Sequence, residues 1–150
     1  MNPEYLLIDG KDKILGRLAA QVAKLALLGK HVLVINTKDI VISGNQQSIF
    51  DWYIEKRNKR TRTQPKWGPF FHRTPDQLFR RTCRGMLPFK MPHGEAAFKR
   101  IHASITDDYD KAMHRKVVPY EVPDAGKERL SHDYITLETL GNRFGWKLQV

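Results

Sequence analysis

Cations and aromatic rings alternate through residues 56–100, and this pattern is the first chemical signal in the sequence. The segment, called the basic block below, holds 13 Lys and Arg residues against two acids, Asp76 and Glu95, so its net charge is +11. The remaining residues hold 13 basic and 14 acidic side chains, so the chain's net charge of +10 arises in the block. Lys and Arg neutralise phosphates, while aromatic and guanidinium planes stack on unpaired bases. The composition therefore favours a nucleic acid, and RNA in particular, as the partner.

Two stretches of the basic block carry most of the candidate RNA-binding side chains. KRNKRTRTQPKWGPFFHR, residues 56–73, contains two prolines and a glycine, and its basic residues follow no helical period, so we expect a long surface loop. FRRTCRGMLPFK, residues 79–90, places three arginines at helical spacing. The candidates are Lys56, Arg57, Lys59, Arg60, Arg62, Lys66, Trp67, His72, Arg73, Arg80, Arg81, Arg84, Lys90, Lys99 and Arg100.

The positive charge of the basic block is also compatible with partners that are not nucleic acids. An anionic membrane or an acidic protein would attract the block, and the block could equally be a solvated surface whose aromatic residues belong to the core. No strongly amphipathic basic helix with large apolar residues occurs outside the packed elements, which disfavours a membrane.

Residues for metal or thiol chemistry are sparse. The six histidines show neither HExxH nor another metal-ligand spacing, so we expect no metal site. The single cysteine, Cys83, excludes an intrachain disulfide, and we interpret it as a small buried hydrophobe. Cys83, His72 and Asp76 are the residue types of a thiol enzyme, but nothing in their spacing brings them together.

A nucleotide site is the main enzymatic alternative. The apolar strand at residues 5–8 leads into DGKDKILGRLA, which contains neither GxGxxG nor GxxxxGK[ST], so we expect no nucleotide cofactor. A nucleotide- or RNA-modifying enzyme on a doubly wound sheet would place its site at the strand ends near Asp9 and Ser43. A plain turn is the better interpretation of Ser43-Gly44-Asn45.

The first third of the chain is typical of a βαβ unit. A strand at residues 5–8 is followed by apolar residues at helical spacing from Ile14 to Ala26, with Gly29 as the stop, and by a strand at residues 31–36. Such units build parallel sheets with helices on both sides. A short β segment at residues 40–42 and a helix over 48–57 complete this part.

Thr74-Pro75-Asp76-Gln77 has the pattern of a helix start, with Thr as N-cap and Pro at the first helical position. The pattern predicts a helix over 75–87 that Pro88 ends. We expect Phe79, Cys83, Met86 and Leu87 on its apolar face and the three arginines on another. Beyond it we expect a short helix over 95–101, a last strand over 102–106, a surface connection over 107–129 and a terminal helix over 136–143.

Length and composition indicate one domain spanning residues 1–150. The chain of 150 residues is 41% hydrophobic, enough for a core, and its longest apolar runs are far shorter than the roughly 20 residues that cross a bilayer. The N-terminus resembles neither a secretory signal nor a transit peptide, so we expect the protein to stay where it is made.

Three motifs in register resemble a known family. DGKDKILGRLAAQVAKLALLGK (9–30), VLVINTKDIVISGN (32–45) and FRRTCRGMLPFK resemble the universal large-ribosomal-subunit protein thirteen family in order and spacing, over residues 5–146. WGPFFHRTPDQLF and LGNRFGWK are similar to its archaeal and eukaryotic branch. Cys83 stands where the family usually has a branched aliphatic residue.

The resemblance implies a three-layer α/β/α fold around a four-stranded parallel sheet, and a structural role on large-subunit ribosomal RNA without catalysis or cofactor. The family's RGMLP element falls on residues 84–88, and its basic loop and helix fall on 56–84. The implied partners are large-subunit ribosomal RNA and neighbouring large-subunit proteins, with no membrane, small-molecule substrate or homo-oligomer. The implied location is the large subunit in the cytoplasm, with nucleolar assembly if the source is eukaryotic.

Overall fold

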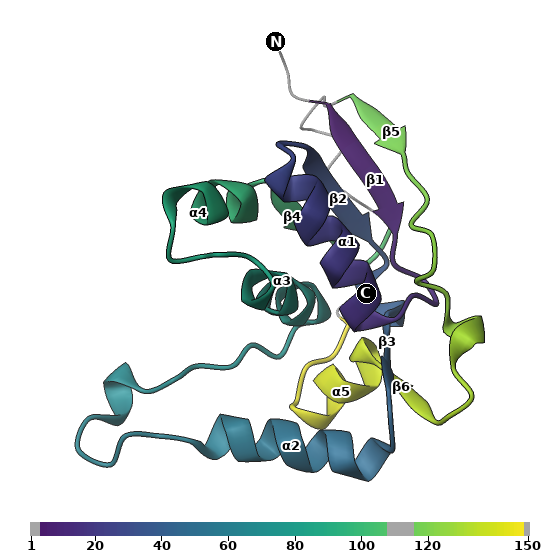
Figure 1. The fold of residues 1–150 in the computed structure, drawn as a ribbon. Helices are drawn as coiled ribbons and strands as arrows, with labels where there is room; N and C mark the ends of the chain where they lie inside the picture. Colours follow the sequence, from purple (N-terminus) through teal and green to yellow (C-terminus); the bar gives the residue numbers. More distant parts are fainter. Residues whose placement is uncertain (1–3, 108–115, 149–150) are drawn as a thin grey trace.

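A four-stranded parallel sheet lies at the centre of the protein (Figure 1). The computed structural model describes residues 4–107 and 116–148. The strand order is β4-β2-β1-β5, and each neighbouring pair runs parallel. The bounds are Tyr5–Asp9 for β1, His31–Ile35 for β2, Ile101–Ala103 for β4 and Val117–Pro119 for β5. The predicted α/β class with a four-stranded parallel sheet is confirmed.

Helices and a second, two-stranded sheet surround this centre. The helices are α1 (Leu15–Leu27), α2 (Gln46–Asn58), α3 (Pro75–Gly85), α4 (Pro92–Lys99) and α5 (Leu137–Arg143). In the small sheet, β3 (Val41–Ser43) pairs antiparallel with β6 (Tyr134–Thr136). These elements are consistent with a three-layer α/β/α arrangement. No helix within the described ranges has the length and apolar character that a membrane crossing requires.

The apolar residues from which the βαβ unit is predicted are buried in the structure. The apolar face of α1 is buried against β2, where Val32 and Val34 are fully covered. Gly29 follows the helix with φ of 85°, a left-handed conformation that favours glycine and ends α1 as predicted. Leu18 and Val22 have no exposed surface, and burial of each such side chain contributes about 1.5–3 kcal/mol.

The predicted apolar face of α3 is correct except at one residue. Phe79, Cys83 and Leu87 are buried, but Met86 is 42% exposed. The helix ends at Gly85, two residues earlier than predicted, so Met86 and Leu87 both lie beyond its last turn, and only Leu87 is buried there. Pro75 and Leu78 are the additional buried residues of α3.

The expected surface connection over 107–129 is partly wrong. Residues 108–115 lie outside the described residues, but Val117–Pro119 is a strand that pairs with β1 at the edge of the sheet. Proline is tolerated there because an edge strand leaves one side of its backbone unpaired. The strand expected over 102–106 begins at Ile101, ends at Ala103 and is followed by two further strands. The short helix expected over 95–101 begins earlier, at Pro92.

Cys83 provides a test of this packing. Its side chain has no exposed surface, and burial raises the pKa of its thiol to about 12. Because the thiolate is the reactive form, we expect negligible reaction of the native protein with a chromogenic disulfide reagent at pH 8, and one thiol per chain after denaturation in guanidinium. The chain contains no other cysteine, so the absorbance change reports this site alone. Rapid labelling of native protein would contradict the packing of α3.

Gly94 provides a second test, because α4 packs on the backbone that follows α3. A β-carbon at Gly94 would overlap the carbonyl oxygen of Pro88 and lie 2.5 Å from its carbonyl carbon. We expect Gly94→Ala to lower the free energy of unfolding by about 1–3 kcal/mol, as overpacking commonly does. In Gly16→Ala, the control in the first turn of α1, the methyl group meets nothing within 4 Å. That change should be neutral or stabilising by about 0.4–1 kcal/mol. Urea denaturation measures both, and equal unfolding midpoints would refute the close contact.

Candidate nucleic-acid interface

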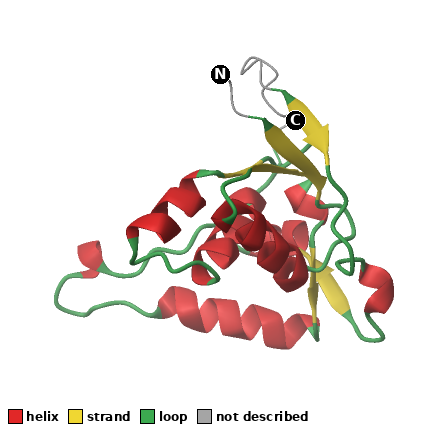
Figure 2. Cartoon of the chain, turned by 45° about the horizontal axis from the view of Figure 1, so that its top comes forward, coloured by secondary structure: helices red, strands yellow, loops and turns green. Residues whose placement is uncertain are grey.

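The basic block begins in the last turn of α2, passes through a long loop, returns along α3 and ends just after α4, at Arg100. Figures 1 and 2 both show this loop projecting away from the body of the protein. The side-chain Oδ1 of Asn45 caps the start of α2 by accepting from the backbone N–H of Gln47 at 2.9 Å. Between the helices, the loop contains only a short 3-10 turn, Pro65–Trp67. The extended loop predicted over 56–73 is confirmed from residue 59 onward, whereas residues 56–58 belong to the last turn of α2.

Helix α5 and Phe144, which directly follows it, contact both ends of this projecting segment. At the first end, the Arg57 guanidinium lies 5.2 Å from the ring centroid of Phe144, and the Tyr53 ring lies 6.4 Å from the same ring. At the second end, Gly141 approaches the loop so closely that a β-carbon there would lie 2.9 Å from the Arg73 carbonyl oxygen. The loop is therefore fixed where it leaves α2 and where it reaches α3.

Most candidate side chains reach solvent. Four of the fifteen are half-buried: Lys56, Arg57, Arg80 and Arg100. The other eleven are exposed: Lys59, Arg60, Arg62, Lys66, Trp67, His72, Arg73, Arg81, Arg84, Lys90 and Lys99. Trp67 is 76% exposed, which is unusual for so large an apolar side chain.

Aromatic rings, rather than carboxylates, lie beside the arginines of α3. The Arg84 guanidinium lies 4.0 Å from the ring centroid of Phe89, while Arg80 lies 5.0 Å from Phe98 and Arg81 lies 5.6 Å from Phe71. Within the described part of the chain, none of these three arginines pairs with an acid. A cation–π contact orients a guanidinium but leaves its charge in place. The charge of α3 therefore stays available to an external anion.

The ion pairs formed by lysines of the block are weak. Lys59 lies 3.2 Å from Glu55, and Lys99 lies 2.9 Å from Glu95, in both cases one helical turn apart. All four side chains are more than half exposed, and such pairs contribute little to stability. A competing polyanion can therefore displace either carboxylate at low cost.

Arg100 and Lys56 have further contacts within the fold. Arg100 donates from Nη1 to the carbonyl oxygen of Ala26 at 3.2 Å, so it satisfies a backbone group in the last turn of α1. Lys56 places Nζ 3.5 Å from the ring centroid of Trp52 on the preceding turn of α2.

Three hollows bring candidates from different segments together. A hollow of about 560 Å³ lies at the link between α3 and α4 and includes Arg81, Arg84 and Lys90. A smaller hollow of about 200 Å³ includes Arg57, Arg60 and Arg73. The remaining candidates, Arg62, Lys66, Trp67, Arg80, Lys99 and Arg100, line neither of these hollows nor the groove described next.

The third hollow, called the aromatic groove below, measures about 470 Å³ and lies between α2, the loop and α3. Its lining consists of Trp52, Tyr53, Lys56, Lys59, Pro69, Phe70, Phe71, His72, Leu78, Arg81, Thr82 and Gly85. Burial raises the pKa of Tyr53, so its phenol stays neutral at physiological pH. The candidates chosen from the sequence omit four aromatic residues that line the groove: Trp52, Tyr53, Phe70 and Phe71. The sequence does contain a signal for Trp52, because helical spacing places it one turn before the candidate Lys56.

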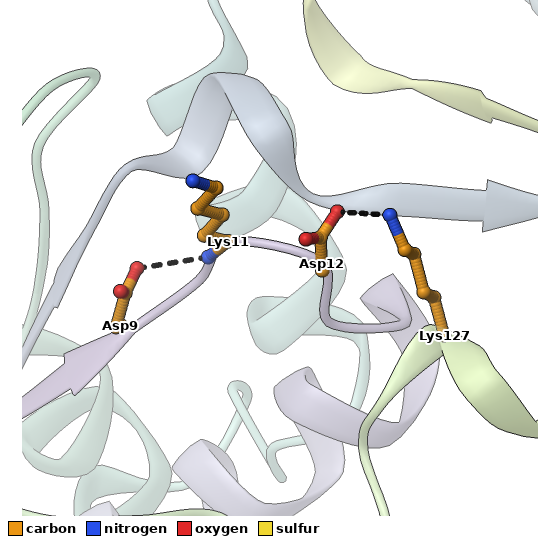
Figure 3. A network of polar contacts seen from close by, with 4 residues as sticks. All are labelled: Asp9, Lys11, Asp12 and Lys127. Atoms are coloured by element: carbon orange, nitrogen blue, oxygen red, sulfur yellow. Dashed lines mark hydrogen bonds and ion pairs between the residues drawn. The ribbon is translucent and has the colours of Figure 1, made fainter.

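The strand ends hold a polar network that serves the turn after β1 (Figure 3). Oδ1 of Asp9 accepts from the backbone N–H of Lys11 at 2.9 Å and from Nδ2 of Asn36 at 3.1 Å. Asp12 pairs with Lys127 at 2.8 Å, and this hydrogen bond raises the pKa of Lys127. Both carboxylates are thus engaged in fixing the turn.

The residues of each enzymatic alternative belong to more than one element. Ser43 belongs to β3 in the small sheet, whereas Asp9 ends β1 in the parallel sheet. His72 is exposed and Cys83 is fully buried, so these two side chains do not share an environment. Among the described residues, no group of His, Cys, Asp and Glu side chains could hold a metal ion.

Comparison with known proteins accounts for the motifs in the N-terminal two thirds. The family model described as ribosomal protein L13 matches residues 3–107, a span that contains the whole basic block. The chain belongs to this family. The resemblance predicted from the three motifs is therefore confirmed.

Three similar relatives are archaeal proteins. Large ribosomal subunit protein uL13 of Methanopyrus kandleri is 40% identical over 147 residues, which cover 97% of this chain and 89% of the relative. The protein of the same name from Methanocaldococcus jannaschii is 37% identical over 142 residues, covering 94% and 98%. That of Methanococcus maripaludis is 40% identical over 101 residues, covering 67% and 74%. These sources agree with the branch that the sequence indicates.

Proposed function

We propose that this L13-family chain is a structural component of the large ribosomal subunit that binds and stabilises large-subunit ribosomal RNA through its basic block. Family membership supports the ribosomal role, since the relatives are named large ribosomal subunit proteins. The observation that carries the RNA contact is the separation of charge: the basic block, which includes the projecting loop and α3, has a net charge of +11, and the rest of the chain is nearly neutral.

In this proposal the α/β body is a rigid platform. Arg81 and Arg84 are exposed on α3, and guanidinium groups bind phosphates through two parallel hydrogen bonds. The loop over residues 59–73 passes between RNA elements. Because such contacts reach phosphate and sugar, the shape of the RNA provides most of the specificity and the affinity falls with salt.

The proposal includes no catalysis and no cofactor. Neighbouring large-subunit proteins are the further partners, and the protein acts in the cytoplasm as part of the subunit. An enzyme acting on nucleotides remains the alternative, and thermal stability with and without mononucleotides distinguishes it, since a ligand at 100 times its Kd adds about 2.7 kcal/mol.

Sedimentation tests the ribosomal role. A tagged copy of the chain is expressed in its own organism, and the lysate is separated on a sucrose gradient in moderately high salt with subunits dissociated. We expect the tagged protein in the large-subunit fraction at a constant ratio to ribosomal RNA. Recovery of the protein only at the top of the gradient would reject the structural role.

The salt dependence of RNA binding tests the placement of the arginines. We expect the double variant Arg81→Ala with Arg84→Ala to reduce the slope of log K against log salt by roughly one unit per lost phosphate contact. Arg80 is retained because it is half-buried beside Phe98. Filter binding to the organism's own large-subunit ribosomal RNA measures the slope.

A control for this experiment removes the same charge elsewhere. Arg17 and Lys24 are exposed on α1, outside the basic block. Arg17→Ala with Lys24→Ala should leave the slope unchanged. An equal loss of slope in both double variants would mean that net charge alone, rather than α3, determines binding.

A further inference from the structure

The aromatic groove is lined by large apolar side chains whose exposure to water is unfavourable. Phe70 is 69% exposed and Trp52 is 49% exposed, although both are large apolar side chains. They come from different segments, the loop and α2, and they line one hollow of about 470 Å³. Exposed apolar surface gathered in one concave site is typical of a binding site, and the volume lies within the range of about 300–1,000 Å³ seen for ligand sites.

The rim of the groove is cationic. Lys56, Lys59 and Arg81 line it together with His72, and no acidic residue is among the lining residues. Lys56 lies 3.5 Å over the Trp52 ring, and Arg81 lies 5.6 Å from the Phe71 ring, so cations stand directly beside the apolar walls. The site therefore combines flat apolar surfaces with positive charge within one side-chain length.

We infer that the aromatic groove takes one unpaired nucleobase of an RNA strand, stacked on Phe70 and Trp52, with the flanking phosphates on Lys56, Lys59 and Arg81. This inference rests on the proposed RNA-binding function and names the part of the RNA that this site binds. Base stacking on aromatic side chains is tolerant of sequence, because every base presents a flat face.

Charge complementarity favours a base over a protein side chain. An apolar side chain from a neighbouring protein would cover the same walls, but it would also cover Lys56 and Arg81 without supplying an anion. Burial of a charge without a partner is unfavourable. A nucleotide brings its phosphates with its base, so a single ligand satisfies the apolar walls and the cationic rim. The Glu55 partner of Lys59 is exposed and is readily displaced.

The test compares two strands that differ only in their bases. The full-length protein is titrated, by fluorescence anisotropy at one salt concentration, with an unstructured RNA of about twelve nucleotides and with a strand of the same length built from stable abasic spacers. We expect the base-bearing strand to bind about tenfold more tightly or better, since stacking contributes at this level per base. Phe70→Ala should remove most of this preference and leave binding of the abasic strand unchanged within about twofold.

Two further substitutions separate stacking from general apolar contact. Phe70→Tyr keeps a flat ring and should retain the preference for the base-bearing strand, whereas Phe70→Leu keeps apolar volume without a ring and should lose it. Tyr134→Ala, which removes a ring that is 45% exposed on β6 outside the groove, is the matched control and should change neither affinity.

The possible results separate failure of the base site from failure of RNA binding as a whole. Equal affinity of the wild-type protein for both strands would overturn the base site while leaving RNA binding intact. Wild-type behaviour of Phe70→Leu would also overturn it, since an apolar side chain without a flat ring would then be sufficient. Failure to bind any strand, even at low salt, would instead reject RNA binding by the basic block.

Discussion

Burial of one face of α3 is the interaction on which the rest of the structure depends. Phe79 and Cys83 are fully covered where α3 packs on α1, β4 and α5. This burial fixes the rotation of the helix, and the helical period then places Arg81 and Arg84 on the solvent side. The loop before α3 and the link to α4 after it take their directions from the same helix. The core therefore determines where the positive charge lies.

The positive charges on that surface are not neutralised by carboxylates of the residues that the structure describes. Acidic neighbours would lower the repulsion between Arg81 and Arg84, but within the described residues both stand beside rings, Phe71 and Phe89. A cation–π contact is worth about 0.5–1 kcal/mol at exposed sites, less than a well-formed bond to a phosphate. Arg81 and Arg84 therefore repel each other in the free protein, and binding of an external anion reduces this repulsion.

The sequence predicts the elements whose patterns are long and local. Helix α1 follows from thirteen residues of regular apolar spacing, and the start of α3 follows from Thr74-Pro75. Strands β5 and β6 escape prediction because each has only three residues, and their pairing with β1 and β3 is set by contacts distant in the sequence. The aromatic groove escapes for the same reason, because Trp52 and Phe70 are brought together only when α2 and the loop fold back on α3.

The end of β1 gives a physical reason for the location of the candidate interface. In many parallel α/β sheets the turn after the first strand stays open, and the backbone of a glycine-rich loop receives a phosphate there. Here Gly10 donates its N–H to the Ile35 carbonyl at 2.9 Å, and a β-carbon at Gly10 would lie 2.9 Å from that same oxygen. The turn is closed onto β2 and Ile40, and Asp9 and Asp12 hold it there. With this turn packed, the sheet acts as a support, and the exposed cations and rings lie on α2, the loop and α3.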